Sequence, residues 1–317
     1  MSRIVITGAS GFIGSAIWTA ARRQGHEAVG LSRGSIAGLH TVDIQDPDAL
    51  VPHLAGAETV VHASGLAHVF GPAAAHAADF HRANVDAVEA LSTAAARAAV
   101  PHIILLSSVS VYGGAEARGV DEAAHCAPVG SYASSKLAGE ERAARIASQS
   151  GLGLTTLRLA TVYGEGDRGN VARLMRAIDA RRFLWIGRGD NRKSLIHRDD
   201  VAAAVLAAAS AGARGIRIFN VSADPVLMRD VVNGLARELH RRIAPVHMPA
   251  AVARLAGVAG CRFGFGTLAG TVGKWLADDF YRSARIREEL GVTPQVSLAD
   301  GLRRQVAHYR DTDAADA

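Results

Sequence analysis

The sequence predicts an α/β fold, a doubly wound parallel sheet with a smaller lobe toward the C-terminus. Three observations support this prediction. An apolar run at the N-terminus leads directly into a glycine-rich turn and an Ala-rich helical pattern. Further short apolar runs, of the kind that form buried parallel strands, recur through the first half of the chain. The length, 317 residues, suits one such domain plus a smaller attachment.

Composition narrows the classes of protein that the chain can represent. Apolar residues make up 49% of the chain, enough for a large core, and charged residues make up 21%. The formal charge of +5 could indicate nucleic-acid binding, but the basic residues are dispersed among acids, and we find no nucleic-acid or zinc-ligand motif. We therefore predict no nucleic-acid partner and no metal, and we interpret the basic balance as suited to small anionic ligands such as nucleotide diphosphates.

The chain shows no sign of secretion or membrane insertion. Cys126 and Cys261 support no disulfide framework, and the chain begins directly with an apparent strand rather than a signal peptide. The longest apolar stretches, such as 201–209, are too short to span a bilayer. We therefore expect a cytoplasmic protein with no membrane partner.

The first predicted element is a strand over Ile4–Ile6, followed by three glycines with the spacing Thr-Gly-x-x-Gly-x-x-Gly. Glycines at a strand-to-helix turn let the backbone approach a pyrophosphate, which then lies on the N-terminus of the helix. An ordinary tight turn is the alternative. We interpret the turn as a dinucleotide site and assign its contacts to Gly8, Ser10, Gly11, Phe12, Ile13 and Gly14.

The second predicted strand, Glu27–Leu31, ends at the position that selects the cofactor. A carboxylate there would bind the ribose diol of NAD and repel a 2′-phosphate. This chain has Ser32 and Arg33 instead, and a hydroxyl and a guanidinium suit a 2′-phosphate. We therefore predict NADP, with NAD as the alternative if Arg33 is only a solvated loop residue.

Tyr132 and Lys136 are the candidate catalytic pair. Four residues are about one helical turn, so the two side chains share a helix face. A phenol has an unperturbed pKa near ~10, and we expect the nearby ammonium to lower it. A tyrosine tuned in this way is a general acid–base for hydride transfer at a carbon that bears an oxygen. Alone, a Tyr-x-x-x-Lys pattern occurs often by chance as a surface tyrosine and a solvated lysine. The glycine turn earlier in the chain favours the catalytic interpretation.

Together, the glycine turn and the Tyr-x-x-x-Lys pair resemble the extended short-chain dehydrogenase/reductase family, also described as NAD-dependent epimerases and dehydratases. The resemblance covers nearly the whole chain and is closest to bacterial UDP-sugar 4-epimerases and 4-ketoreductases. It implies a homodimer with a Rossmann-type NADP-binding domain and a substrate-binding lobe. We place the NADP-binding domain at 1–168 with 196–222 and the substrate-binding lobe at 169–195 and 223–310. We expect a disordered tail at 311–317.

The resemblance also assigns residues around the pair. Ser108, after the strand predicted over 103–107, matches the family residue that binds the substrate oxygen and completes a triad with Tyr132 and Lys136. His62, in the strand predicted over 59–63, is expected to be structural. Asp43 resembles the family aspartate at the adenine amino group, and Asn84 the asparagine that helps hold a water beside the lysine. The other implied cofactor contacts are Ile44, Ala63, Ser64, Gly65, Ser107 and Ala160.

Substrate contacts follow from the same resemblance. Asn170 matches an asparagine on the substrate phosphates, and Lys193 an arginine on the diphosphate; Arg192 and Ser110 are further candidates. These could instead be surface charges.

Another strand is predicted over 154–159. The family usually has proline where this chain has Leu159 and Glu165, which leaves the shape of that loop open. His197 and Asp199 are expected to cap and brace the helix that follows them.

The C-terminal third is expected to supply most of the smaller lobe. The apolar, Gly-rich stretch 248–276 is interpreted as lobe core or dimer contact rather than a membrane-surface helix. A closing helix is predicted within 283–294 and an amphipathic helix over 298–309.

The implied activity is NADP(H)-dependent hydride transfer at a carbonyl carbon of a nucleotide-linked sugar, with the substrate in the cleft between the two lobes. A UDP-sugar 4-epimerase with bound NAD, a reductase of a non-sugar ketone and a non-catalytic dinucleotide sensor stay open as alternatives. An intact triad argues against the sensor. We expect no 4,6-dehydratase activity, because dehydratases of the resembled family carry an Asp-Glu pair, as added acid and base, where this chain has Val109 and Ser110.

Overall fold

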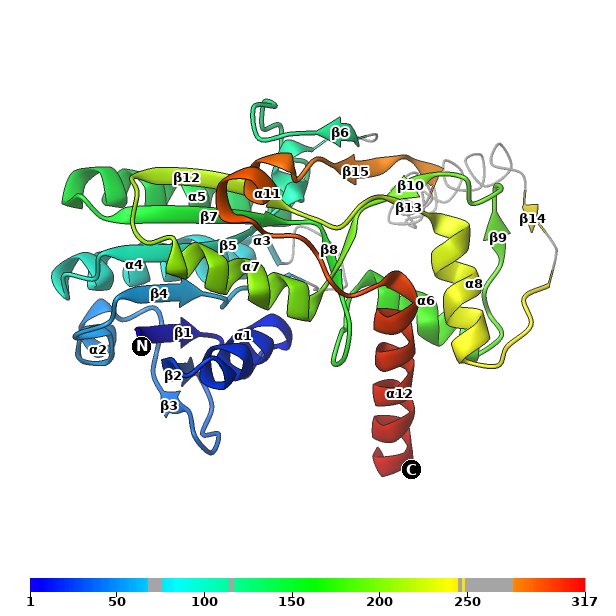
Figure 1. Cartoon of the computed structure of the whole chain (residues 1–317), viewed down its shortest axis with the longest axis horizontal. Coiled ribbons are helices and arrows are strands. Elements are labelled where there is room, and N and C mark those ends of the chain that lie inside the picture. Colours follow the sequence, from blue (N-terminus) through cyan, green and yellow to red (C-terminus); the bar gives the residue numbers. More distant parts are fainter. Residues whose placement is uncertain (68–75, 114–116, 245–246, 249–275, 317) are drawn as a thin grey trace.

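The computed structural model describes residues 1–67, 76–113, 117–244, 247–248 and 276–316. Its centre is a seven-stranded sheet in the order β12-β7-β5-β4-β1-β2-β3 (Figure 1), and every neighbouring pair is parallel. This confirms the doubly wound prediction. The strands are β1 (Arg3–Thr7), β2 (Glu27–Ser32), β3 (His40–Thr41), β4 (Thr59–His62), β5 (His102–Ser108), β7 (Gly153–Leu159) and β12 (Ile216–Val221).

Strand side chains alternate between two hydrophobic cores, one on each face of the sheet. In β1, Ile4 and Ile6 belong to one core and Val5 to the other. Helices α1 (Phe12–Arg23) and α7 (Arg198–Ser210) supply the first core. Helices α2 (Pro47–Leu54), α4 (Ala87–Arg97) and α5 (Ser131–Ser150) supply the second. The near-continuous apolar strands therefore reflect burial on both faces.

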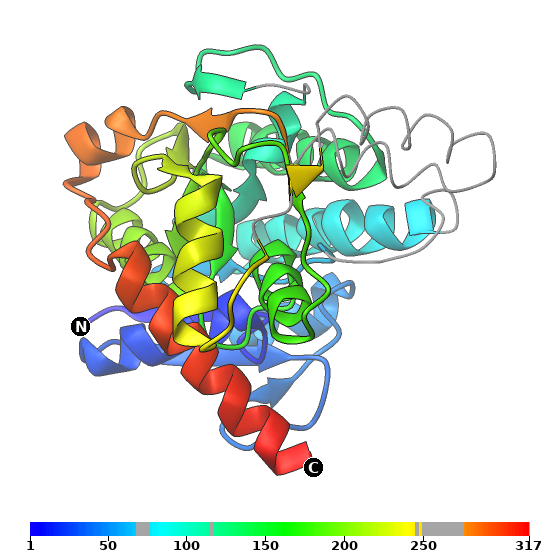
Figure 2. The ribbon, with the colours of Figure 1, turned by 90° about the vertical axis from the view of Figure 1, so that its right-hand side faces the viewer.

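A third core lies among α6 (Asn170–Asp179), α8 (Met228–Glu238) and α12 (Leu298–Asp316), at one end of the molecule (Figure 2). The main sheet beside it is β13 (Val226–Leu227), β10 (Arg192–Lys193), β15 (Asp279–Tyr281) and β6 (Ala117–Val120). Two further pairs join β8 (Thr161–Tyr163) to β11 (Leu195–His197) and β9 (Trp185–Ile186) to β14 (His247–Met248). This core supports a second lobe, whose boundaries stay a prediction.

The C-terminal segment differs from the expectation. The closing helix is present as α11 (Ala284–Leu290), but α12 continues past 309 to Asp316, where we predicted disorder. Extending a formed helix costs less than nucleating one, and Tyr309 anchors the preceding turn by a hydrogen bond to Asp179 (3.2 Å). The Thr312 hydroxyl donates to the carbonyl of His308 at 3.0 Å. The expectation for 248–276 lies almost entirely outside the described residues.

No helix in the described part of the chain is long and apolar enough to cross a membrane.

His102 begins β5 with a buried ring, whose Nε2 lies 2.9 Å from Thr155 Oγ1. Burial lowers the pKa of His102 to about 4, and the nearby Arg217 charge adds to this. The folded pKa therefore lies below the unfolded value near 6.5. As pH falls from 6.5 toward 4, His102 is protonated in the unfolded chain but stays neutral in the folded chain. The free energy of unfolding therefore falls.

His102→Gln should make the protein less sensitive to acid, because the amide can still bond to Thr155 but does not titrate. Between pH 7 and pH 5 the wild type should lose about 2 kcal/mol more unfolding free energy than the variant, since each unit of pKa difference corresponds to about 1.4 kcal/mol. Urea unfolding of both proteins at the two pH values measures this. Equal losses in wild type and variant would contradict the assignment to His102.

Candidate active site

The glycine turn has the geometry of a dinucleotide cradle. Gly8 adopts φ +67°, and Gly11 donates its N–H to the Gly8 carbonyl at 2.8 Å. A Cβ on Gly14 would lie 2.0 Å from the same carbonyl oxygen, so only glycine fits there. Gly11 caps α1, and no side chain caps its first N–H groups. Ser64 lies against the turn, 2.9 Å from a Cβ placed on Gly8. The turn therefore fits a bound pyrophosphate.

The end of β2 places the two residues predicted to select the cofactor, Ser32 and Arg33, in different surroundings. Ser32 is buried and its hydroxyl donates to the Gly34 carbonyl at 2.5 Å. Arg33 is exposed, and no ion pair joins it to another described residue. Asp43, exposed after β3, accepts from the Gln45 N–H at 3.0 Å, and Ile44 is buried. Of Ser32 and Arg33, only Arg33 therefore has hydrogen-bond donors free for a 2′-phosphate.

The predicted triad comes together from β5 and α5. Tyr132 and Lys136 lie one turn apart near the start of α5. Ser108 ends β5, accepts from the Ser110 N–H at 3.2 Å, and shares a hydrogen bond with the Tyr132 phenol. Lys136 Nζ donates to the Leu106 carbonyl at 2.6 Å. The carboxyl end of β5 therefore contacts both predicted catalytic side chains of α5.

The pKa of Tyr132 corrects one expectation. Burial raises it, and the Ser108 hydrogen bond lowers it; Lys136 is not among the causes of the shift. The Phe80 ring, 5.8 Å from the Tyr132 ring, contributes to this burial. Burial also lowers the pKa of Lys136 to about 8, and Glu140 one turn further raises it. The expected lowering of the phenol pKa is therefore wrong, because burial, the largest cause of the shift, raises the pKa of Tyr132.

His62 and Asn84 lie near Lys136, and each makes hydrogen bonds to other parts of the chain. His62 Nδ1 lies 3.0 Å from Thr7 Oγ1, and burial, with the Lys136 charge, lowers the pKa of His62 to about 3. Asn84 lies in a single π-helical turn (Arg82–Asp86), and its amide donates to the Leu66 carbonyl and Ser135 Oγ, both at 3.0 Å. Asn84 therefore holds the loop after β4 against α5; its expected water contact stays a prediction.

The other predicted residues fall into two groups. The remaining cofactor candidates lie at or just after carboxyl ends of central strands: Ala63, Ser64 and Gly65 after β4, Ser107 in β5, and Ala160 after β7. The substrate candidates Asn170, Arg192 and Lys193 lie in the second lobe, on α6 and β10. Ser110 lies near the triad, and its buried hydroxyl has no hydrogen-bond partner among the described residues.

A buried ion pair behind the triad was missed by the sequence reading. Arg158, in β7, donates from Nε and Nη2 to the Glu140 carboxylate at 3.1 and 2.7 Å, and both side chains are buried. The Arg158 guanidinium also lies 4.9 Å from the Tyr112 ring centre. The only charged residue in a fully buried strand was the available signal, but its partner could not be predicted from the sequence.

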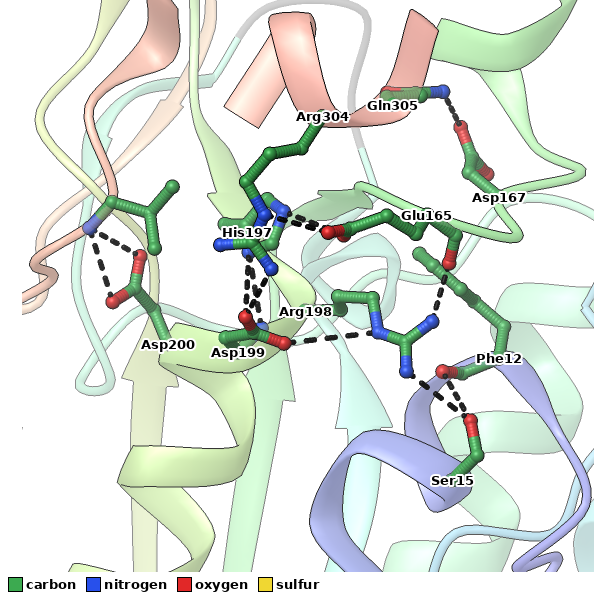
Figure 3. Close-up of polar contacts among 11 residues, drawn as sticks. Phe12, Ser15, Glu165, Asp167, His197, Arg198, Asp199, Asp200, Arg304 and Gln305 are labelled. Atoms are coloured by element: carbon green, nitrogen blue, oxygen red, sulfur yellow. Dashed lines mark hydrogen bonds and ion pairs between the residues drawn. The ribbon is translucent and has the colours of Figure 1, made fainter. Parts of the chain in front are cut away.

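Figure 3 shows a second unpredicted network, centred on the residue that replaces the family proline. Arg304, from α12, donates to Glu165 Oε1 at 2.6 Å and to Asp199 Oδ2 at 2.5 Å. His197 caps α7 by accepting the Asp199 N–H at Nδ1, as predicted, so its proton lies on Nε2, 3.2 Å from Glu165 Oε2. Glu165 thus ties the loop after β8 to α12.

Arg198 extends this network to the glycine turn. Its guanidinium donates to the Glu165 carbonyl and, at 3.3 Å, to Ser15 Oγ in the first turn of α1. It also lies 5.5 Å from the Phe12 ring centre. The loop after β8 is therefore held over the N-terminus of α1, beside the dinucleotide cradle.

Comparison with known proteins gives consistent matches. Residues 4–222 match the model of the NAD dependent epimerase/dehydratase family. A 2-alkyl-3-oxoalkanoate reductase of Stenotrophomonas maltophilia (strain K279a) is 26% identical over 95% of this chain and 98% of its own. A dTDP-4-dehydrorhamnose reductase of Mycobacterium tuberculosis (strain CDC 1551 / Oshkosh) is 30% identical over 72% of each chain. The solved structure of MoeE5 in complex with UDP-glucose and NAD is 28% identical, covers 98% of this chain and 99% of its own, and superposes with a TM-score of 0.79.

Proposed function

Since the chain belongs to the NAD dependent epimerase/dehydratase family, and so is an NAD(P)-dependent enzyme of the extended short-chain dehydrogenase/reductase type, we propose that it reduces a ketone on a nucleotide-linked sugar with NADPH. The observation that carries the proposal is the convergence of Ser108, Tyr132 and Lys136 at the carboxyl end of β5. A relative named as a dTDP-4-dehydrorhamnose reductase and a structural neighbour with bound UDP-glucose support the substrate class.

When bound, the reduced dinucleotide supplies the hydride. Ser108 orients the carbonyl oxygen, and Tyr132 donates its phenolic proton to that oxygen as the hydride reaches the carbon. A phenol whose pKa is raised by burial is fully protonated at neutral pH, which suits a proton donor in the reducing direction. Lys136, one turn from Tyr132 on α5 and held by the Leu106 carbonyl, would bind the nicotinamide ribose of the dinucleotide. The glycine turn would hold the pyrophosphate, and Asn170, Arg192 and Lys193 the substrate phosphates.

A 4-epimerase is the main alternative, and the family description supports an epimerase as directly as a reductase. A reductase of a non-sugar ketone is favoured by the likeness to a 2-alkyl-3-oxoalkanoate reductase. The discriminating experiment incubates the protein and NADPH with 4-keto sugars linked to UDP and TDP, and separately with UDP-hexoses and with a 3-oxoalkanoate. One NADPH consumed per sugar reduced supports the proposal. Interconversion of UDP-sugars without net NADPH consumption contradicts it in favour of the epimerase, and activity on the oxoalkanoate alone contradicts the sugar assignment.

No 4,6-dehydration is expected, because Val109 and Ser110 follow Ser108 where that reaction needs an added acid and base. UDP- and TDP-hexoses should therefore pass through incubation without losing water. Mass spectrometry of the sugar products checks this. A 4-keto-6-deoxy product from any of them would contradict the expectation.

Arg33→Asp should reverse the preference between NADP and NAD. Charge-assisted contacts to a 2′-phosphate are worth ~1.5–3 kcal/mol, so the wild type should prefer NADP by about ten- to a hundredfold. The introduced carboxylate repels that phosphate and binds a ribose diol. Calorimetric titration with both dinucleotides measures this.

Ser32→Ala is the matched control for that titration. The Ser32 hydroxyl already donates to the Gly34 carbonyl, so its removal should leave the preference nearly unchanged. Equal binding of NAD and NADP by the wild type would contradict the cofactor assignment.

The cytoplasmic location and the homodimer stay predictions.

A further inference from the structure

An open groove of about 460 Å³ runs beside α8, on the third core's outer side. Its lining includes Arg188, Arg229, Arg237 and Arg241, and no acidic residue of the described chain lines it. The indole of Trp185 is also part of this lining and is itself mostly buried in the core. Figure 2 shows α8 facing outward at this end of the molecule. The groove is therefore a strongly basic concavity with an apolar floor.

Two of the four guanidinium groups have carboxylates beside them. Arg229 pairs with Asp190, and Arg241 Nε lies 3.0 Å from Asp179 Oδ1. No ion pair joins Arg188 or Arg237 to another residue in the described ranges, and both are exposed. Four guanidinium groups and two carboxylates leave two uncompensated positive charges. Both exposed arginines border one concavity, so their charges raise the local potential for an anion there.

We propose that this groove binds a small molecule carrying a diphosphate. A diphosphate matches the two uncompensated charges, and arginine donates pairs of parallel hydrogen bonds to phosphate oxygens. The volume lies within the ~300–1,000 Å³ typical of small-molecule sites and exceeds what a single phosphate needs. The Asn233 amide, also in the lining, can both donate to and accept from the organic part of the ligand.

The groove is distinct from the predicted catalytic cleft. None of the predicted catalytic, cofactor or substrate residues lines it. Figure 1 shows α8 and β9 at the end of the molecule beyond α6, whereas the triad lies at the end of β5 and the start of α5. A diphosphate bound beside α8 would therefore leave the triad accessible to its own substrate.

The test is calorimetric titration with pyrophosphate, and separately with UDP, at about 0.15 M ionic strength, where diffuse surface attraction is screened. The variants are Arg188→Ala/Arg237→Ala and a control of equal charge change, Arg214→Ala/Arg310→Ala, which removes two exposed arginines outside the groove. Thermal unfolding establishes that both double variants fold. Besides binding at the predicted substrate contacts, we expect the wild type to show a saturable site whose affinity is at least about tenfold weaker in the groove variant and unchanged in the control.

Three outcomes would overturn the proposal. Equal weakening in both double variants would mean diffuse attraction to a basic surface. Loss of binding in Lys193→Ala with full binding in the groove variant would place the pyrophosphate at the predicted substrate contact. Displacement of the pyrophosphate by saturating NADPH would place it in the glycine turn. Each result leaves the proposed reductase activity to be judged by its own assay, because that assay depends on the triad and not on α8.

Discussion

Tyr132→Phe should lower turnover by about 100- to 10,000-fold, the usual cost of losing a general acid, while leaving dinucleotide affinity nearly unchanged. The substitution removes only the hydroxyl that shares a hydrogen bond with Ser108, and the ring keeps its packing near Phe80. NADPH consumption under saturating substrate measures turnover, and calorimetry measures dinucleotide affinity. A fall in kcat with little change in dinucleotide Kd would identify a proton donor rather than a binding residue.

Tyr309→Phe is the matched control. It also removes one phenolic hydroxyl, which bonds to Asp179 on the third core, remote from the triad in the sequence and in the fold. Its turnover should stay close to that of the wild type. If Tyr132→Phe keeps more than about a tenth of wild-type activity, another group supplies the proton, and the assignment of Tyr132 fails.

Glu140→Gln should reduce the unfolding free energy by about 3–5 kcal/mol, because it leaves the buried Arg158 guanidinium without a counter-charge. Burial lowers the pKa of Arg158, but the Glu140 carboxylate raises it further, so the arginine is charged in the wild type. An arginine does not lose its proton in the variant either, and the buried charge would then be unpaired. Chemical unfolding in urea measures the loss. The same variant should lower the pKa of Lys136, because Glu140 is the group that raises it.

Glu89→Gln provides the comparison for this effect. Glu89 pairs with Arg142 at 2.9 Å, but both side chains are 41% exposed, so the loss should stay below about 1 kcal/mol. The double variant Glu140→Gln/Arg158→Met should recover much of the stability, because it removes the unpaired charge as well. A cost for Glu140→Gln no larger than that for Glu89→Gln would contradict the importance of the buried pair.

The sequence predicted those parts of the fold that short stretches of chain determine. Apolar runs gave five of the seven central strands, β1, β2, β4, β5 and β7, to within about two residues, because strands buried on both faces of a parallel sheet are mostly apolar; β3 and β12 were not predicted. The glycine turn was predictable because its backbone excludes a Cβ at Gly14 whatever surrounds it. The pairing of Tyr132 with Lys136 needed only the period of a helix. Helix α12 was predicted too short, since its continuation depends on turns already packed against α6 and α8.

The sequence by itself therefore determined the doubly wound sheet, the glycine turn and the shared helix face of Tyr132 and Lys136, which follow from local period and backbone sterics. Only the tertiary structure decided the electrostatic environment of those residues. The pairing of Glu140 with Arg158 and of Glu165 with Arg304 joins residues 18 and 139 positions apart. Burial of the Tyr132 phenol and the gathering of arginines beside α8 likewise depend on elements distant in the chain. Desolvation and charge pairing depend on what surrounds a group in space, and that neighbourhood exists only after the chain has folded.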